Sequence, residues 1–154
     1  MKFPYVKFGA KTPEGGEYAS FRPVIPIEVR YRGGRATRYM ALLDSGADVS
    51  MFHAEMAEVL GIDLKGGREM FFWGVGHGKS TGYIHDVEIN VGGWWVTCSV
   101  AFCPGMIRQD PLDPSRTQGL FYGILGQAGF FEQFDTKFDR SAKQVELSLR
   151  QARV

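Results

Sequence analysis

The sequence has few cysteines, almost no excess charge and no long hydrophobic run. A formal net charge of +1 over 154 residues argues against a dedicated nucleic-acid-binding protein. No apolar run approaches the ~20 residues that span a bilayer, and the first residues lack the apolar core of a secretory signal. We therefore expect a soluble, cytoplasmic protein that binds neither nucleic acid nor a membrane.

The two cysteines, Cys98 and Cys103, lie five residues apart in one predicted strand. That spacing places them on opposite faces and about 16 Å apart, too far for a disulfide, so reduced core thiols are expected. Histidine and cysteine do not recur with zinc-ligand spacing, and we predict no metal and no cofactor. We expect His77 and His85, on the arms of a predicted hairpin, and His53 to be exposed to solvent.

Glycine is abundant (20 residues) and aromatics make up 14%, with short β-forming runs between glycine- and proline-rich turns. This composition is typical of a single all-β domain over residues 1–154. Residues 1–20 are expected to form an irregular arm or one short strand, and residues 104–118 an inserted surface loop. Alternating apolar residues predict two hairpins, which turn at Gly33-Gly34 and at Gly92-Gly93.

Two short helices are also predicted. Ser50 can cap a helix over about residues 53–60, and three phenylalanines, Phe130, Phe131 and Phe134, can form the apolar side of another. Four arginines cluster around the first hairpin and are expected to form a solvated face; they are Arg30, Arg32, Arg35 and Arg38.

Residues 39–43 form an apolar run that leads directly into Asp44, Ser45 and Gly46. This pattern predicts a buried strand that delivers a carboxylate to a tight turn. Asp-Ser-Gly is also a common sequence in ordinary turns, so the tripeptide alone does not identify a catalytic acid.

A second motif, Gly-Ile-Leu-Gly-Gln, occupies residues 123–127. The two motifs, in this order, resemble those of the retropepsin-like aspartic proteases, and the resemblance extends over residues 24–149. It implies a small closed acid-protease barrel with a flap hairpin and one or two short helices. Many members of that family have Arg where Gln127 stands, paired with an acid equivalent to Asp48, and Gln cannot supply a charged bidentate fork.

β-Forming arms flank a glycine-rich tip at residues 74–78. The resemblance implies that this hairpin is a flap over an extended peptide, since glycines let backbone amides approach a ligand closely. A phosphate-binding loop is the competing interpretation. Against that interpretation, the segment lacks the G-x-G-x-x-G spacing, and no helix is predicted after it.

A single Asp-Ser-Gly implies two chains, because metal-free peptide hydrolysis needs one group to accept a proton and another to donate one. The resemblance assigns Asp44 as the catalytic acid and base, with Ser45 and Gly46 completing the catalytic turn. It assigns substrate binding to Ala47, Asp48, Trp73, Gly74, Val75, Gly76 and Ile124.

The sequence therefore favours a homodimeric aspartic endopeptidase that acts on peptide or protein substrates. One alternative is a catalytically silent retropepsin-like module for dimerisation or peptide binding. Another is a monomeric β-barrel that binds small ligands and carries Asp44 in an ordinary turn.

Overall fold

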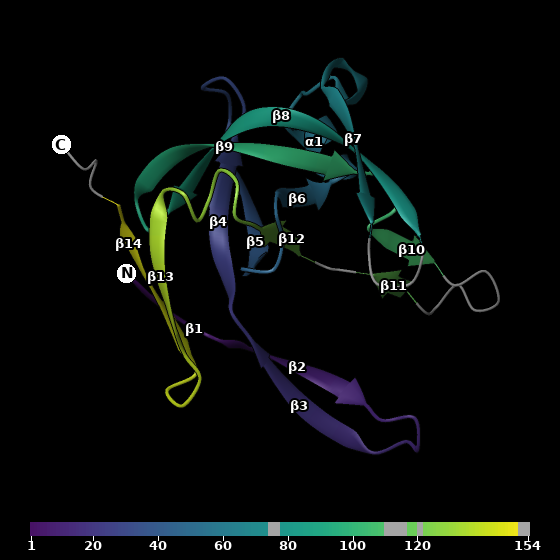
Figure 1. Cartoon of the computed structure of the whole chain (residues 1–154), viewed down its shortest axis with the longest axis vertical. Helices are drawn as coiled ribbons and strands as arrows, with labels where there is room; N and C mark the ends of the chain where they lie inside the picture. The colour runs from purple at the N-terminus through teal and green to yellow at the C-terminus, as the bar shows by residue number, and fades with distance from the viewer. Residues whose placement is uncertain (74–77, 110–116, 120–121, 151–154) are drawn as a thin grey trace.

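The computed structural model describes residues 1–73, 78–109, 117–119 and 122–150. Its centre is a sheet with the order β4-β5-β12-β6-β9-β8-β7, in which β8 also pairs with β4 and so closes the barrel (Figure 1). Seven strands make up this sheet: β4 (Val24–Arg30), β5 (Thr37–Leu43), β6 (Ser50–His53), β7 (Arg68–Trp73), β8 (Lys79–Val91), β9 (Trp94–Cys103) and β12 (Gly123–Leu125). The predicted all-β closed barrel is confirmed.

The core follows from the alternation of side chains along these strands. In β4 the buried residues Ile25, Ile27 and Val29 alternate with more exposed ones, and the β8–β9 hairpin repeats the pattern. Cys98 and Cys103 are both buried free thiols in β9, as predicted.

Helical structure is short. The α-helix α1 (Ala54–Val59) confirms the first predicted helix, and a 3₁₀ turn, η1 (Leu64–Gly66), follows it. None of the described helices has the length and hydrophobicity needed to cross a bilayer. The cap prediction was wrong, because Ser50 lies in β6 and His53 occupies the N-cap without a side-chain cap bond.

The second predicted helix does not form. Residues 127–133 are a series of turns, because Gly129 adopts φ +84° and Phe134 already begins the next strand. Phe130 and Phe134 are nevertheless buried and stack with ring centroids 4.9 Å apart. The phenylalanine spacing therefore marks core residues of a compact turn.

The chain termini form a second, three-stranded sheet with the order β1-β14-β13. It contains β1 (Lys2–Pro4), β13 (Phe134–Asp139) and β14 (Gln144–Leu149), and β13 and β14 form an antiparallel hairpin.

The prediction of an irregular arm over residues 1–20 was wrong. After β1, the strands β2 (Val6–Lys11) and β3 (Glu17–Arg22) pair in six antiparallel positions. A turn with Gly15 at φ +86° joins them. The proline and glycine residues of this segment mark turns between strands.

The segment predicted to be a surface loop, residues 104–118, contains short β-strands toward both of its ends. There, β10 (Ile107–Gln109) pairs with β11 (Thr117–Gly119). The remainder of the predicted loop, residues 110–116, lies outside the described residues.

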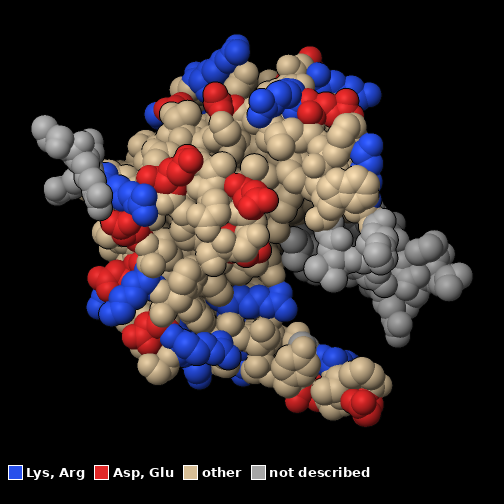
Figure 2. Space-filling model, viewed as in Figure 1, with Lys and Arg blue, Asp and Glu red and all other residues tan. Residues whose placement is uncertain are grey.

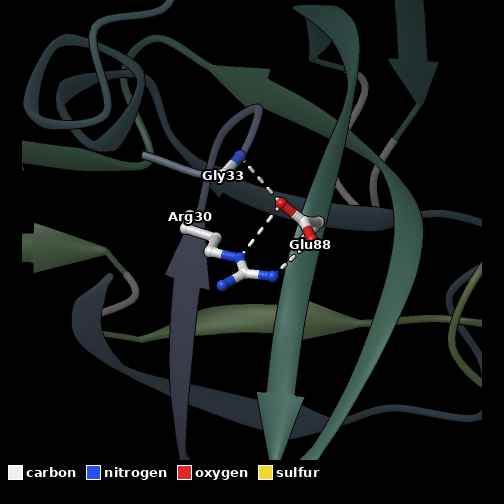
Figure 3. A network of polar contacts seen from close by, with 3 residues as sticks. All are labelled: Arg30, Gly33 and Glu88. Atoms are coloured by element: carbon white, nitrogen blue, oxygen red, sulfur yellow. Dashed lines mark hydrogen bonds and ion pairs between the residues drawn. The ribbon is translucent and has the colours of Figure 1, made fainter. Parts of the chain in front are cut away.

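An ion pair joins β4 and β8 where the barrel closes. Arg30 donates from Nη2 to Glu88 Oε1 at 2.7 Å and from Nε to Oε2 at 3.0 Å, and the Gly33 amide also donates to Oε2 (Figure 3). The Arg30 guanidinium carbon lies 4.0 Å from the ring centroid of Trp95. Arg30 is therefore only partly solvated, contrary to the prediction for the arginine cluster.

Candidate active site

Asp44 follows the last residue of β5 and is held by the backbones of two neighbouring segments. Its amide donates to the Leu125 carbonyl at 3.0 Å, and the preceding amide, of Leu43, donates to the Pro23 carbonyl at 3.0 Å. Strand β5, buried at Ala41 and Leu43, therefore delivers the carboxylate to the end of the barrel, between the start of β4 and the end of β12.

The turn after Asp44 is stabilised by its own backbone. The Gly46 amide donates to Asp44 Oδ1 at 2.9 Å, and the Ala47 amide donates to the Asp44 carbonyl at 3.2 Å. Asp44 is half-buried, whereas Ser45 and Gly46 are exposed. Within the described residues the Asp44 carboxylate forms no ion pair and Oδ2 accepts no hydrogen bond.

The second motif lies directly against this turn. β12 runs parallel to β5, with Leu125 opposite Leu43, and the Gly126 amide donates to Ser50 Oγ at 3.0 Å. A Cβ atom on Gly126 would lie 2.5 Å from the Val49 carbonyl oxygen, so a side chain there would displace backbone. The two motifs are therefore packed as one unit.

Residues 127 and 128 extend this contact along the turn. The amides of Gln127 and Ala128 donate to the carbonyls of Ala47 and Asp48 at 2.8 Å and 2.9 Å. The Gln127 side chain donates from Nε2 to the Ser45 carbonyl at 2.7 Å. Gln127 thus braces the turn as a neutral donor.

Two solved structures are similar to this chain in fold. A retropepsin-like aspartic protease from Rickettsia conorii aligns with a TM-score of 0.51 and 16% identity, over 94% of this chain and 95% of that chain. The chain has the retropepsin-like fold. EIAV protease, in complex with an inhibitor, aligns with a TM-score of 0.46 and 20% identity, over 69% of this chain and 82% of that chain. No protein-family model and no curated protein matches the sequence.

In this retropepsin-like fold, three of the predicted substrate-binding residues lie around the Asp44 turn. Ala47 is half-buried and Asp48 is exposed, both within the turn. Ile124 is buried in β12, opposite Leu42 of β5. Asp48 forms no ion pair with any described residue.

The residues predicted to form a flap lie in the β7–β8 hairpin and at its tip. Trp73 ends β7 opposite Lys79, and its side chain is 76% exposed. Three predicted site residues, Gly74, Val75 and Gly76, lie outside the described residues, as does His77.

Sequence reasoning missed a hydrogen-bonded pair between the half-buried Tyr39 and the buried His53. The Tyr39 hydroxyl and His53 Nδ1 form a hydrogen bond, and His53 is only 6% exposed, contrary to the predicted solvated position. Burial raises the pKa of Tyr39, which therefore stays protonated. Tyr39 also packs edge-on against Phe52. Periodicity could not reveal the pair, because the two residues belong to different strands.

His85 is the other histidine within the described residues that the sequence predicts to be exposed, and that prediction was also wrong. Its Nε2 atom hydrogen-bonds the Leu64 carbonyl at 2.9 Å, and its ring packs edge-on against Phe102. His85 is half-buried and attaches β8 to the 3₁₀ turn.

Proposed function

We propose that this protein is a homodimeric aspartic endopeptidase that hydrolyses peptide bonds by activating water between two Asp44 carboxylates, one from each subunit. The observation that carries the proposal is the half-buried Asp44, which has one oxygen held by the Gly46 amide and the other not hydrogen-bonded to any residue that the structure describes. An ordinary Asp turn would not require the second motif to brace it from a distant part of the chain.

The chemistry requires two acids. Two carboxylates a few ångströms apart do not both ionise, so they share one proton. The ionised one accepts a proton from water as the oxygen attacks the peptide carbonyl carbon, and the protonated one donates to the carbonyl oxygen. The carboxyl that received the water proton then transfers it to the leaving nitrogen, and the carbon–nitrogen bond breaks. A hydroxyl of the intermediate returns its proton to the other carboxylate as the carbonyl re-forms, which restores the shared proton.

A two-fold axis supplies the second acid. Asp44 is followed by Ser-Gly, and no other aspartate in the chain has Ser-Gly or Thr-Gly after it. An isologous interface brings a residue near the axis against its own copy. The exposed Ser45 hydroxyl is then available to hydrogen-bond across the axis and fix the two turns together.

Substrate binding is assigned to the surroundings of this turn. An extended peptide would lie beside Ala47 and Asp48, with an apolar wall from Ile124. The β7–β8 hairpin would cover the peptide as a flap, through Trp73 and the tip residues Gly74, Val75 and Gly76. Such a cleft favours apolar side chains beside the bond that is cut.

The test compares the wild-type protein with Asp44→Asn on an unstructured protein substrate. We expect cleavage by the wild type, none by Asp44→Asn, and no effect of a metal chelator. Equal cleavage by both proteins, or by neither over a wide pH range, would remove the peptidase assignment.

Mixing the two proteins tests the shared site. After subunit exchange, activity should fall as the square of the wild-type fraction, because a dimer with one Asn has no working pair. A linear fall would show that each chain acts alone.

A further inference from the structure

The β2–β3 hairpin projects from the barrel as an arm (Figure 1). It forms a two-stranded sheet of its own, and neither strand pairs with any other described strand. It stands out at the lower right of the space-filling view, with charged side chains along it (Figure 2). An isolated two-stranded hairpin is marginally stable in water, and its open edges favour association.

The base of the arm is firmly attached on one side to Tyr122, the residue before β12. Arg22 donates from Nη1 to the Tyr122 hydroxyl at 2.5 Å, and its guanidinium carbon lies 5.0 Å from the ring centroid of Phe8. Phe8 packs edge-on against Tyr122, with ring centroids 5.7 Å apart.

The other side of the base is attached to the turn of the β13–β14 hairpin. Arg140 donates to the Phe21 carbonyl at 3.2 Å, and Lys143 Nζ lies 4.1 Å from the Phe21 ring centroid. Contacts on both sides give the arm a defined direction where it leaves the barrel.

The arm leaves the barrel at the end that carries the Asp44 turn. β3 ends at Arg22, and the carbonyl of the next residue, Pro23, accepts the Leu43 amide immediately before Asp44. In Figure 1 the connection from β5 to β6 lies on the side of the barrel from which the arm projects.

The outer part of the arm is uncovered in the single chain. Tyr18 shares a face with Phe8 and Arg22 but lies farther out, and its side chain is 55% exposed. The outer arm also forms a hollow of about 560 Å³, lined by Lys7, Gly9, Lys11, Glu17, Tyr18 and Ala19. Gly9 and Ala19 are paired across the strands and leave room for an incoming side chain.

We propose that the arm packs against a second copy of this chain, so that in the dimer the arm of each subunit contacts the other subunit. This inference rests on the proposed function, which places the two-fold axis beside Asp44. A six-residue strand spans about 20 Å, more than the radius of gyration of about 15 Å expected for a chain of this length. An arm of that reach, starting beside the axis, extends over the partner. The interface at the site thus continues onto the arm. The open strand edges of the arm and the Tyr18 side chain would then contact the surface of the partner subunit.

The direct test places a photo-crosslinking amino acid at Tyr18 of the full chain. We expect a covalently linked dimer after irradiation, and none from the same group at Val59, which is 64% exposed on α1. A Tyr18 probe that gives no linked dimer in a protein shown to be dimeric, or that links only to a peptide substrate, would overturn the inference.

A second measurement follows the strength of the dimer. Tyr18→Ser and Ala19→Arg should each raise the dimer dissociation constant about tenfold in sedimentation equilibrium, as loss of an interface anchor does. Val59→Ser is the matched control and should leave the constant unchanged. Circular dichroism checks that each variant folds.

The outcomes separate this inference from the proposed function. One outcome is a dimeric, Asp44-dependent peptidase in which both arm variants have the dimer dissociation constant of the wild type. That outcome would overturn the role of the arm alone. A protein that is monomeric at every concentration and inactive would overturn both.

Discussion

Ser50 Oγ accepts a hydrogen bond from the Gly126 amide at 3.0 Å, in a position where Ser50 is fully buried. The two residues are 76 positions apart in the chain, one at the start of β6 and one in the turn after β12. This bond joins the segment after the Asp44 turn to the second motif. The hydroxyl is therefore part of what holds the candidate catalytic turn in place.

Removing that hydroxyl should destabilise the protein and impair its activity. In Ser50→Ala the buried Gly126 amide loses its acceptor, which costs about 1 to 3 kcal/mol. Denaturant unfolding at fixed protein concentration measures the change in the free energy of unfolding. The rate of peptide cleavage shows whether the Asp44 turn keeps its geometry. Ser141→Ala removes an exposed hydroxyl and should change stability little. Equal stability of the wild type and Ser50→Ala would contradict this role.

Gly126→Ala should destabilise the protein more than the same substitution at a glycine with open space around it. Its Cβ would lie 2.5 Å from the Val49 carbonyl oxygen and 2.7 Å from that of Ala47, so backbone must move. Overpacking of this kind costs about 1 to 3 kcal/mol or more, and here the movement falls on the Asp44 turn. Gly78→Ala, with nothing within 4 Å and no positive φ, is the control for the melting temperature. Similar melting temperatures for the two variants would show that the turn can relax around a methyl group.

The Arg30–Glu88 pair should make stability depend on pH. The Arg30 guanidinium and the Gly33 amide hold the pKa of Glu88 below its usual range. The stabilisation is present above about pH 4.3, the ordinary value for Glu, and is lost as pH falls through the lower folded-state value. The melting temperature of Glu88→Gln should therefore lie below that of the wild type near neutral pH, with a difference that shrinks on acidification. A difference that is constant with pH would exclude a charge effect.

The two cysteines should resist modification while the protein is folded. Burial raises the pKa of Cys98 to about 12 and that of Cys103 to about 11. Because the thiolate is the reactive form, alkylation at neutral pH should be at least about a hundredfold slower than in denaturant. Mass spectrometry after timed alkylation measures both sites. Rapid modification of the folded protein would show that β9 opens readily.

The raised thiol pKa values also give an alkaline limit to stability. Below the ordinary thiol pKa of about 8.5 both cysteines are protonated in the folded and the unfolded chain, so their burial does not make stability depend on pH. As pH rises toward the folded-state values, the unfolded chain releases protons first and the folded state loses stability. A double Cys→Ser variant should lose this part of the alkaline dependence.

Local patterns in the sequence account for much of the fold. The alternation in residues 24–30 and the glycines of the two hairpin turns predict β4, β5, β8 and β9, which the structure confirms. The predictions that were wrong concern residues whose partners lie elsewhere in the chain. Their neighbours in sequence predict that His53 and Arg30 face solvent, but Tyr39 and Glu88 bond them across strands.

The sequence by itself determined that Asp44 ends an apolar strand and enters a tight turn, since strand periodicity and turn chemistry depend on adjacent residues. Only the tertiary structure decided which groups hold that turn, because the Ser50 hydroxyl, the Gly126 amide and the Gln127 side chain meet when the barrel closes. The direction of the β2–β3 arm was decided in the same way, by Tyr122 and the β13–β14 turn. Such contacts join residues about 80 to 120 positions apart, and no local pattern in the chain encodes them.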